Sequence, residues 1–113
     1  MAPMQVMQGL VAAILAKTSA GRIVWTETPA PYLLAAFLKD GFRIELRREE
    51  QFMEKRPVRF EMSLYHAGNR PVGTLKEDAN AAGTLPKLWD AAWSAASDSD
   101  AKVRRAVELI DSL

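Results

Sequence analysis

Two segments of alternating side chains constrain the fold of this chain more than any other feature. In residues 42–48 and again in residues 58–64, apolar side chains at every second position are separated by polar ones. The apolar members are Phe42, Ile44, Leu46, Val58, Phe60, Met62 and Leu64. A period of two is that of a β-strand with one face in a core and the other in water. The pattern therefore predicts two strands of an antiparallel sheet.

Turn signals supply the rest of the sheet. The tripeptide Lys39-Asp40-Gly41 separates residues 42–48 from an apolar segment at 32–38, and Asp-Gly between two such segments is a strong hairpin signal. A second turn at Ala67-Gly68-Asn69-Arg70 leads to a short strand at 71–75, whose proline and glycine suit a sheet edge. Another short strand is predicted at 23–26. We therefore expect a meander of about five strands.

Three helices are expected around this sheet. Residues 4–17 carry apolar side chains at helical spacing, and the Ser19-Ala20-Gly21 break ends that segment. Thr84 is the expected cap of a second helix, and Asp98 or Ser99 the cap of a third. The second helix has its apolar stripe at Leu85, Leu88, Trp89, Ala92, Trp93 and Ala96, and the third at Val103, Ala106, Val107, Ile110 and Leu113. Both tryptophans are expected in the core, because large aromatic rings dominate core burial.

This order of elements predicts an α+β fold: an antiparallel β-meander of about five strands with an N-terminal helix and two C-terminal helices. The chain has 113 residues, of which 49% are hydrophobic, so it is long enough for one packed core and too short for two. Residues 1–113 are therefore expected to form a single α+β domain.

Charge alternation predicts how residues 42–48 and 58–64 pair. If the numbers of facing residues sum to 104, Arg43 faces Glu61 and Glu45 faces Arg59, whereas sums of 102 and 106 bring like charges together. We therefore expect the register with a sum of 104.

Several chemistries find no support in the composition. The chain has no cysteine, which excludes disulfides, thiolate nucleophiles and thiolate metal sites. His66 is the only histidine and lies beside a turn, where a solvated side chain is the ordinary role. Glu45 and Glu61 could be imagined as an acid–base pair, but they lie among arginines and cross-strand ion pairs are the expected use. We therefore expect no catalytic residue, no metal site, no cofactor and no enzymatic activity.

The apolar segment at 32–38 points to a partner surface. Because it is apolar at odd and even positions alike, one apolar set must face away from the helices. A three-residue loop at 39–41 would place Leu33, Ala35 and Phe37 outside, whereas a two-residue turn would place Tyr32, Leu34, Ala36 and Leu38 there. An exposed apolar strip marks a partner surface or is covered by another element, here the first helix or the connector at 48–57.

The sequence thus predicts a small non-catalytic protein–protein interaction module acting through its sheet face. It would bind another protein or itself as a homodimer. The expected binding residues are Tyr32, Leu34, Leu38, Arg43, Arg47 and Arg59.

The alternative is a single-stranded nucleic-acid-binding module that uses the same face. Residues 39–61 hold seven basic and six acidic side chains, so the patch is nearly neutral, and this favours a protein partner. Outward aromatic rings beside Arg43 and Arg47 would favour nucleic acid. A deep pocket with a desolvated carboxylate would favour an enzyme.

The first apolar segment, residues 4–16, bears on location. No basic residue precedes it, and it is shorter than the roughly 20 residues of a membrane span. We expect a cytoplasmic protein that does not enter a membrane.

Three short motifs resemble a group of short uncharacterised bacterial proteins of unknown function. They are Leu15-Ala16-Lys17-Thr18 with Gly21-Arg22-Ile23-Val24-Trp25, then Phe42-Arg43-Ile44-Glu45-Leu46, and then Leu64-Tyr65 with Gly68 and Val72-Gly73. The resemblance covers about half of the chain, and the connector at 48–57 is longer than in that group. It implies no activity and no catalytic residue. On topology alone, a meander followed by a helix is also similar to single-strand DNA-binding modules.

Overall fold

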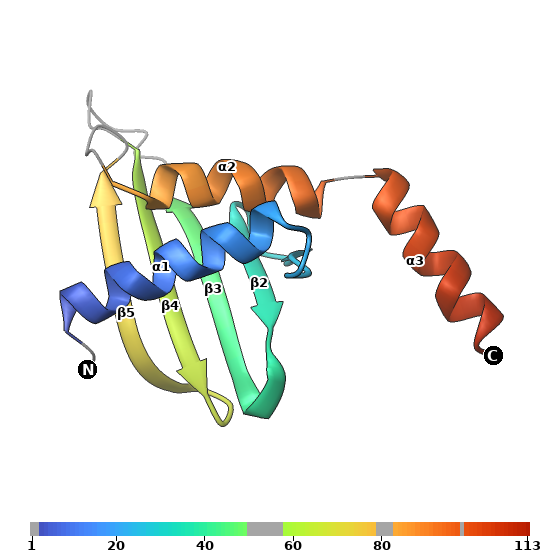
Figure 1. The fold of residues 1–113 in the computed structure, drawn as a ribbon, viewed down its shortest axis with the longest axis horizontal. Coiled ribbons are helices and arrows are strands. Elements are labelled where there is room, and N and C mark those ends of the chain that lie inside the picture. The colour runs from blue at the N-terminus through green and yellow to red at the C-terminus, as the bar shows by residue number, and fades with distance from the viewer. Residues whose placement is uncertain (1–2, 50–57, 79–82, 98) are drawn as a thin grey trace.

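The computed structural model describes residues 3–49, 58–78, 83–97 and 99–113 of the chain. In chain order its elements are α1 (Met4–Ser19), β1 (Thr26–Glu27), β2 (Leu33–Phe37), a 3₁₀ turn (Lys39–Gly41), β3 (Phe42–Glu49), β4 (Arg59–His66), β5 (Arg70–Asp78), α2 (Leu85–Ala96) and α3 (Ser99–Asp111). The predicted α+β class is confirmed, with an N-terminal helix, a five-stranded antiparallel sheet and two C-terminal helices (Figure 1). The connector at 50–57 and the cap residue Asp98 lie outside the described residues.

The sheet is a meander with the strand order β1-β2-β3-β4-β5. Between β2 and β3 the chain makes a three-residue loop, because Phe37 faces Arg43 and the Leu38 N–H donates to the Phe42 carbonyl at 2.8 Å. Asp40 and Gly41 have φ values of 62° and 79°, a left-handed conformation that explains why the loop uses this pair. Of the two hairpin geometries, the three-residue loop is the one observed. It turns Leu33, Ala35 and Phe37 away from the helices.

The predicted register of β3 and β4 is wrong. Facing residues sum to 108, not 104, so that Arg43 faces Tyr65 and Arg47 faces Glu61. This register also avoids like charges, and it pairs all eight residues of each strand. A sum of 104 would instead leave Tyr65 opposite Lys39 in the loop. The observed register therefore keeps the charge pairing and adds an aromatic contact at the end of the strands.

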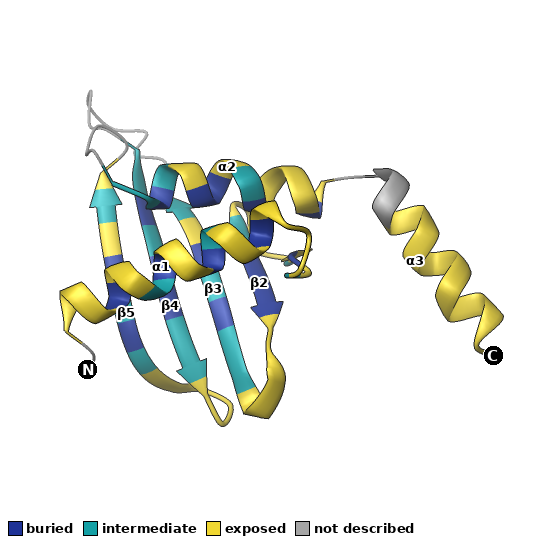
Figure 2. Cartoon of the chain, in the orientation of Figure 1, coloured by how far each residue is buried: buried dark blue, intermediate teal, exposed yellow. Residues whose placement is uncertain are grey.

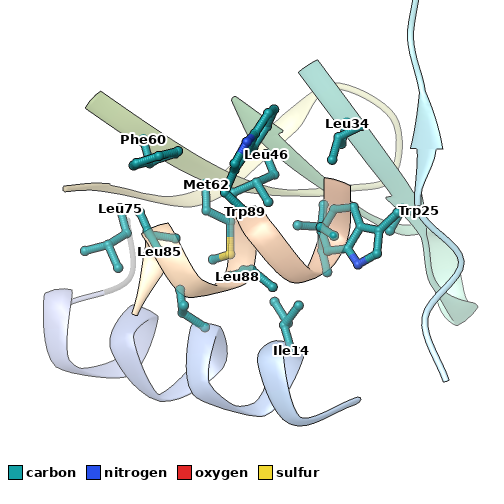
Figure 3. Packing of buried hydrophobic residues seen from close by; sticks show 14 of the residues in the cluster. Ile14, Trp25, Leu34, Leu46, Phe60, Met62, Leu75, Leu85, Leu88 and Trp89 are labelled. Carbon is teal, nitrogen blue, oxygen red and sulfur yellow. The ribbon is translucent and has the colours of Figure 1, made fainter. Parts of the chain in front are cut away.

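The core lies between the sheet and two helices on one of its faces (Figures 1 and 3). Helix α1 contributes Met7, Val11 and Ile14, and the even-numbered residues of β2, β3 and β4 meet them from the sheet. The fully buried large side chains are Met7, Val11, Leu34, Ile44, Leu46, Met62, Leu85 and Leu88. The opposite sheet face carries neither α1 nor α2 (Figure 1).

The bounds of β1 and β5 and the cap of α2 differ from the sequence prediction. Strand β1 has only two residues, because Trp25 turns into the core instead of continuing the ladder. Strand β5 extends to Asp78, three residues beyond the predicted end. Thr84 does not cap α2 with its side chain; instead, Glu77 of β5 accepts a hydrogen bond from the Leu85 N–H at 3.0 Å.

The prediction that both tryptophans of α2 lie in the core is wrong for one of them. Trp93 is 38% exposed because it lies at the edge of the α2 stripe, stacked on Trp89 with ring centroids 5.4 Å apart. Trp89 itself is buried as predicted. The apolar stripe of α3 is exposed, since this helix extends away from the sheet beyond the end of α2 (Figure 2).

Candidate binding surface

The candidate surface is the sheet face opposite α1 and α2, here called the outer face. Alternation of the strands turns the odd-numbered residues of β2, β3 and β4 onto this face. Its members include Leu33, Ala35, Phe37, Arg43, Glu45, Arg47, Arg59, Glu61, Ser63 and Tyr65. Thr74, Lys76 and Asp78 of β5 face Ser63, Glu61 and Arg59 and continue this face. Most of its side chains are polar.

One row across the outer face combines two aromatic rings with an arginine. In the ladder, Phe37 of β2 faces Arg43 of β3, and Arg43 faces Tyr65 of β4. Phe37 is 73% exposed, and the Arg43 guanidinium lies 4.5 Å from the centroid of the Tyr65 ring. A cation at this distance is attracted by the face of the ring. We call Phe37, Arg43 and Tyr65 the aromatic row.

Two further contacts fix Arg43 in this row. Its Nη2 donates to Oδ1 of Asn69, in the turn between β4 and β5, at 3.3 Å. Its Nε lies 3.6 Å from the Glu45 carboxylate on the same strand. Three groups therefore hold this guanidinium in place, on the strand next to the exposed Phe37.

Ion pairs balance the charges next to the aromatic row. Arg59 contacts Asp78 at 3.4 Å, and Lys76 contacts Glu61 at 3.7 Å. Arg47 faces Glu61 in the ladder, is exposed, and makes no ion pair with any residue that the structure describes. The cross-strand ion pairs predicted between β3 and β4, Arg43 with Glu61 and Glu45 with Arg59, are wrong, because the register separates these residues. Arg59 and Glu61 pair with residues of β5 instead.

A shallow hollow of about 210 Å³ lies in the middle of the outer face. Its lining consists of Leu33, Glu45, Arg47, Glu61, Ser63 and Tyr65. Pockets for small molecules usually enclose about 300–1,000 Å³. The hollow suits a side chain of a partner better than a whole small ligand.

The six predicted binding residues do not form one site. Arg43, Arg47 and Arg59 share the outer face, and Leu38 is 38% exposed at the loop beside it. Leu34 is wrong as a surface residue, because the three-residue loop turns it into the core with no exposure. Tyr32 is 39% exposed but lies beside Trp93 of α2, so it belongs to a different surface.

Tyr32 ends a chain of aromatic rings that runs from the core to the surface. Phe60 contacts Trp89, Trp89 stacks on Trp93, and Trp93 lies 6.2 Å from Tyr32 between ring centroids. The Arg48 guanidinium lies 5.8 Å from the centroid of the Tyr32 ring. Tyr32 has a φ of 54°, an uncommon conformation for a residue with a side chain. These contacts anchor the segment between β1 and β2 to α2.

The sequence reasoning missed Phe37 and Tyr65 as surface residues. The predicted binding residues assumed a two-residue turn at 40–41, which exposes Leu34, whereas the observed three-residue loop exposes Phe37. The length of this loop could not be read from the sequence. Tyr65 was missed because the predicted register ended the pairing before it. His66 is exposed as predicted, and its Nε2 donates to the Asp40 carbonyl at 3.1 Å.

Within the described ranges, no three His, Asp or Glu side chains gather in a way that could hold a metal ion. No helix in this part of the chain is long and apolar enough to cross a membrane. No protein-family model, no curated protein and no solved structure matches the chain significantly. The geometry of the outer face is therefore the basis for assigning a function.

Proposed function

We propose that this protein is a small non-catalytic interaction module that binds another protein through the outer face of its sheet. The aromatic row carries the proposal. Exposed aromatic rings and arginines are enriched among the residues that dominate protein–protein binding energy, and Phe37 and Arg43 lie side by side in the ladder. We also propose that the protein acts in the cytoplasm.

The surroundings of the aromatic row fit the rim of a protein interface. Arg59 with Asp78 and Lys76 with Glu61 form exposed ion pairs, which contribute orientation and association rate more than affinity. The partner that fits would insert an apolar or aromatic side chain beside Phe37. It would bring charged groups of both signs to the rim.

The alternative is a single-stranded nucleic acid, and one observation favours it. Phe37 and Tyr65 are outward aromatic rings beside Arg43, as base stacking requires. Glu45 and Glu61 lie on the same face, however, and would repel phosphates. We therefore rank a protein partner first.

The test begins by capturing binding proteins on the wild-type chain and identifying them by mass spectrometry. The affinity of the identified protein is then measured for wild type, Phe37→Ala and Val6→Ala. Val6 is an exposed apolar residue of α1, on the other side of the sheet, and serves as the matched control. We expect Phe37→Ala to weaken binding by about tenfold or more and Val6→Ala to leave it unchanged.

Fluorescence anisotropy with a labelled oligothymidine separates the two alternatives. We expect no binding at physiological salt. Binding that weakens in Phe37→Ala and falls with salt would establish the nucleic-acid alternative. Equal affinity of wild type and Phe37→Ala for the protein partner would contradict the proposed surface.

A further inference from the structure

Helix α3 exposes an apolar stripe from Val103 onward, which Leu113 continues beyond the end of the helix. The stripe consists of Val103, Ala106, Val107, Ile110 and Leu113, which recur at the spacing of one helix face. Val103 is 63% exposed, Ile110 is 65% exposed and Leu113 is fully exposed. Figure 2 shows the exposed helix standing away from the sheet. In an ordinary surface helix such a stripe packs against the hydrophobic core of the same protein.

The helix turns its other side toward the rest of the chain. A hollow of about 600 Å³ separates α3 from the body, and α3 lines it with Lys102, Arg104, Arg105 and Glu108. Lys102 also contacts Glu27 of β1 at 3.6 Å. On a helical projection Arg105 and Glu108 lie opposite the stripe, whereas Lys102 and Arg104 flank it on its two sides. The stripe therefore points away from the body, where the chain's own core cannot cover it.

A 13-residue helix whose apolar face is exposed to water is only marginally stable by itself. Isolated helices shorter than about 12–15 residues are poorly populated in water, and packing of the apolar face supplies most of the stability of a short helix. A partner that covers the stripe would therefore stabilise α3.

The charges beside the stripe identify an occupant. Arg104 and Asp111 lie on the same edge of the stripe, seven residues or about 10 Å apart along the helix axis. If two copies of α3 pack antiparallel about Val107, Arg104 of each copy lies within one residue, about 1.5 Å along the axis, of the level of Asp111 of the other. Val103 then lies within one residue of the level of Ile110 of the other copy, and Val107 meets its own counterpart. The stripe and its charged edge are therefore complementary to themselves, as an isologous two-fold interface requires.

A parallel pair lacks this complementarity. Residues at the same level would then carry the same number, so Arg104 and Asp111 would stay about 10 Å apart. The charge pattern thus favours one orientation as well as one partner.

We propose that α3 is a dimerisation element, which pairs antiparallel with α3 of a second copy of this chain through its apolar stripe. The 13-residue helix is about 20 Å long and gives a small interface, so the dimer is weak and depends on concentration. The proposal is independent of the proposed function, because the outer face and α3 are separate surfaces. It also replaces the strip of β2 as the dimer interface, since Ala35 there is buried and Leu33 half-buried.

Sedimentation velocity from about 10 µM to about 1 mM tests the proposal directly. We expect the wild type to shift from monomer to dimer across this range. Val107→Asp should remain monomeric, because it places a charge at the centre of the stripe. Arg105→Asp places an acidic side chain on the opposite side of the same helix and should dimerise like the wild type.

Charge reversal tests the antiparallel orientation without removing apolar surface. Arg104→Asp should weaken the dimer because it creates two acidic contacts, and Asp111→Arg should weaken it through two basic contacts. The double variant should restore dimerisation. An equimolar mixture of the two single variants should form a heterodimer, since their charges are then complementary at both contacts.

Single cysteines give an independent readout, because the chain has no cysteine of its own. Under mild oxidation, Val107→Cys should form a cross-linked dimer by itself. Val103→Cys and Ile110→Cys should cross-link only when the two variants are mixed. Self-cross-linking of Val103→Cys would show a parallel pair and overturn the proposal.

Two other outcomes would also overturn it. One is a wild type that stays monomeric at every concentration, and the other is a dimer that is unaffected by Val107→Asp. Phe37→Ala is expected to leave dimerisation unchanged, so failure of this proposal and failure of the outer-face proposal are distinguishable.

Discussion

The indole N–H of Trp25 donates a buried hydrogen bond of 3.0 Å to the hydroxyl of Thr18. Trp25 follows the first helix along the chain and is 4% exposed, and Thr18 lies in the last turn of α1. The bond ties the end of α1 to the start of the sheet. It also satisfies the one polar group of a ring that otherwise packs in the core (Figure 3).

Thr18→Val should lower the free energy of unfolding by about 1–3 kcal/mol, because it leaves the buried Trp25 N–H without an acceptor. Chemical denaturation measures the change. Thr18→Ser keeps the hydroxyl and is the control, with a smaller expected loss. An equal loss in both variants would mean that packing of the methyl group, and not the hydrogen bond, matters here.

Two glycines should respond to alanine with opposite signs. Gly9 lies in α1 with open space around it, so Gly9→Ala should raise the free energy of unfolding by about 0.5–1 kcal/mol. At Gly83 an added Cβ would overlap the Glu77 carboxylate, which holds the first N–H of α2. Gly83→Ala should therefore lower the free energy of unfolding by about 1 kcal/mol. Thermal or urea denaturation compares the two, and stabilisation by Gly83→Ala would contradict the role of Glu77.

The two tryptophans of α2 should differ in their contribution to stability. Trp89→Ala should cost about 3–5 kcal/mol, since the ring is buried between Phe60 and Trp93. Trp93→Ala should cost about 1–2 kcal/mol, because much of its ring already contacts water. Equal losses in denaturation experiments would show that Trp93 is buried in solution.

Engineered cysteines can check the register of β3 and β4. Glu45 faces Ser63, and facing Cα atoms lie about 4.5–5.5 Å apart, within the range of a disulfide. The double variant Glu45→Cys/Ser63→Cys should therefore oxidise readily to an internal disulfide, as mass spectrometry would show. Glu45→Cys/Arg59→Cys, the pair expected for a sum of 104, should not. A disulfide in the second variant alone would restore the register predicted from charge.

The sequence predicted the elements better than their contacts. Alternation in residues 42–48 and 58–64 located β3 and β4, because side-chain direction in a strand is a local property. The register was wrong because at least two pairings keep opposite charges together. The choice between them depends on Tyr65 reaching Arg43, a contact between strands that no local pattern encodes.

Burial of the C-terminal helices could not be predicted for a related reason. Helical spacing shows that the stripe of α3 is amphipathic, but not what lies next to it. The Lys102–Glu27 contact turns the polar side of α3 toward the body, and these residues are 75 positions apart in the sequence. The candidate binding surface was mispredicted for a similar reason. The length of one loop decides whether Leu34 or Phe37 is exposed.

The outer face as binding surface is tested most directly by amide chemical shifts of the ¹⁵N-labelled chain during titration with its captured protein partner. The aromatic row predicts the largest changes at Phe37, Arg43 and Tyr65, with smaller ones at neighbouring outer-face residues. Phe37→Ala should reduce these changes at the same partner concentration. If the changes were confined to α1, α2 or α3 and the amides of β2, β3 and β4 were unaffected, the proposed function would be contradicted.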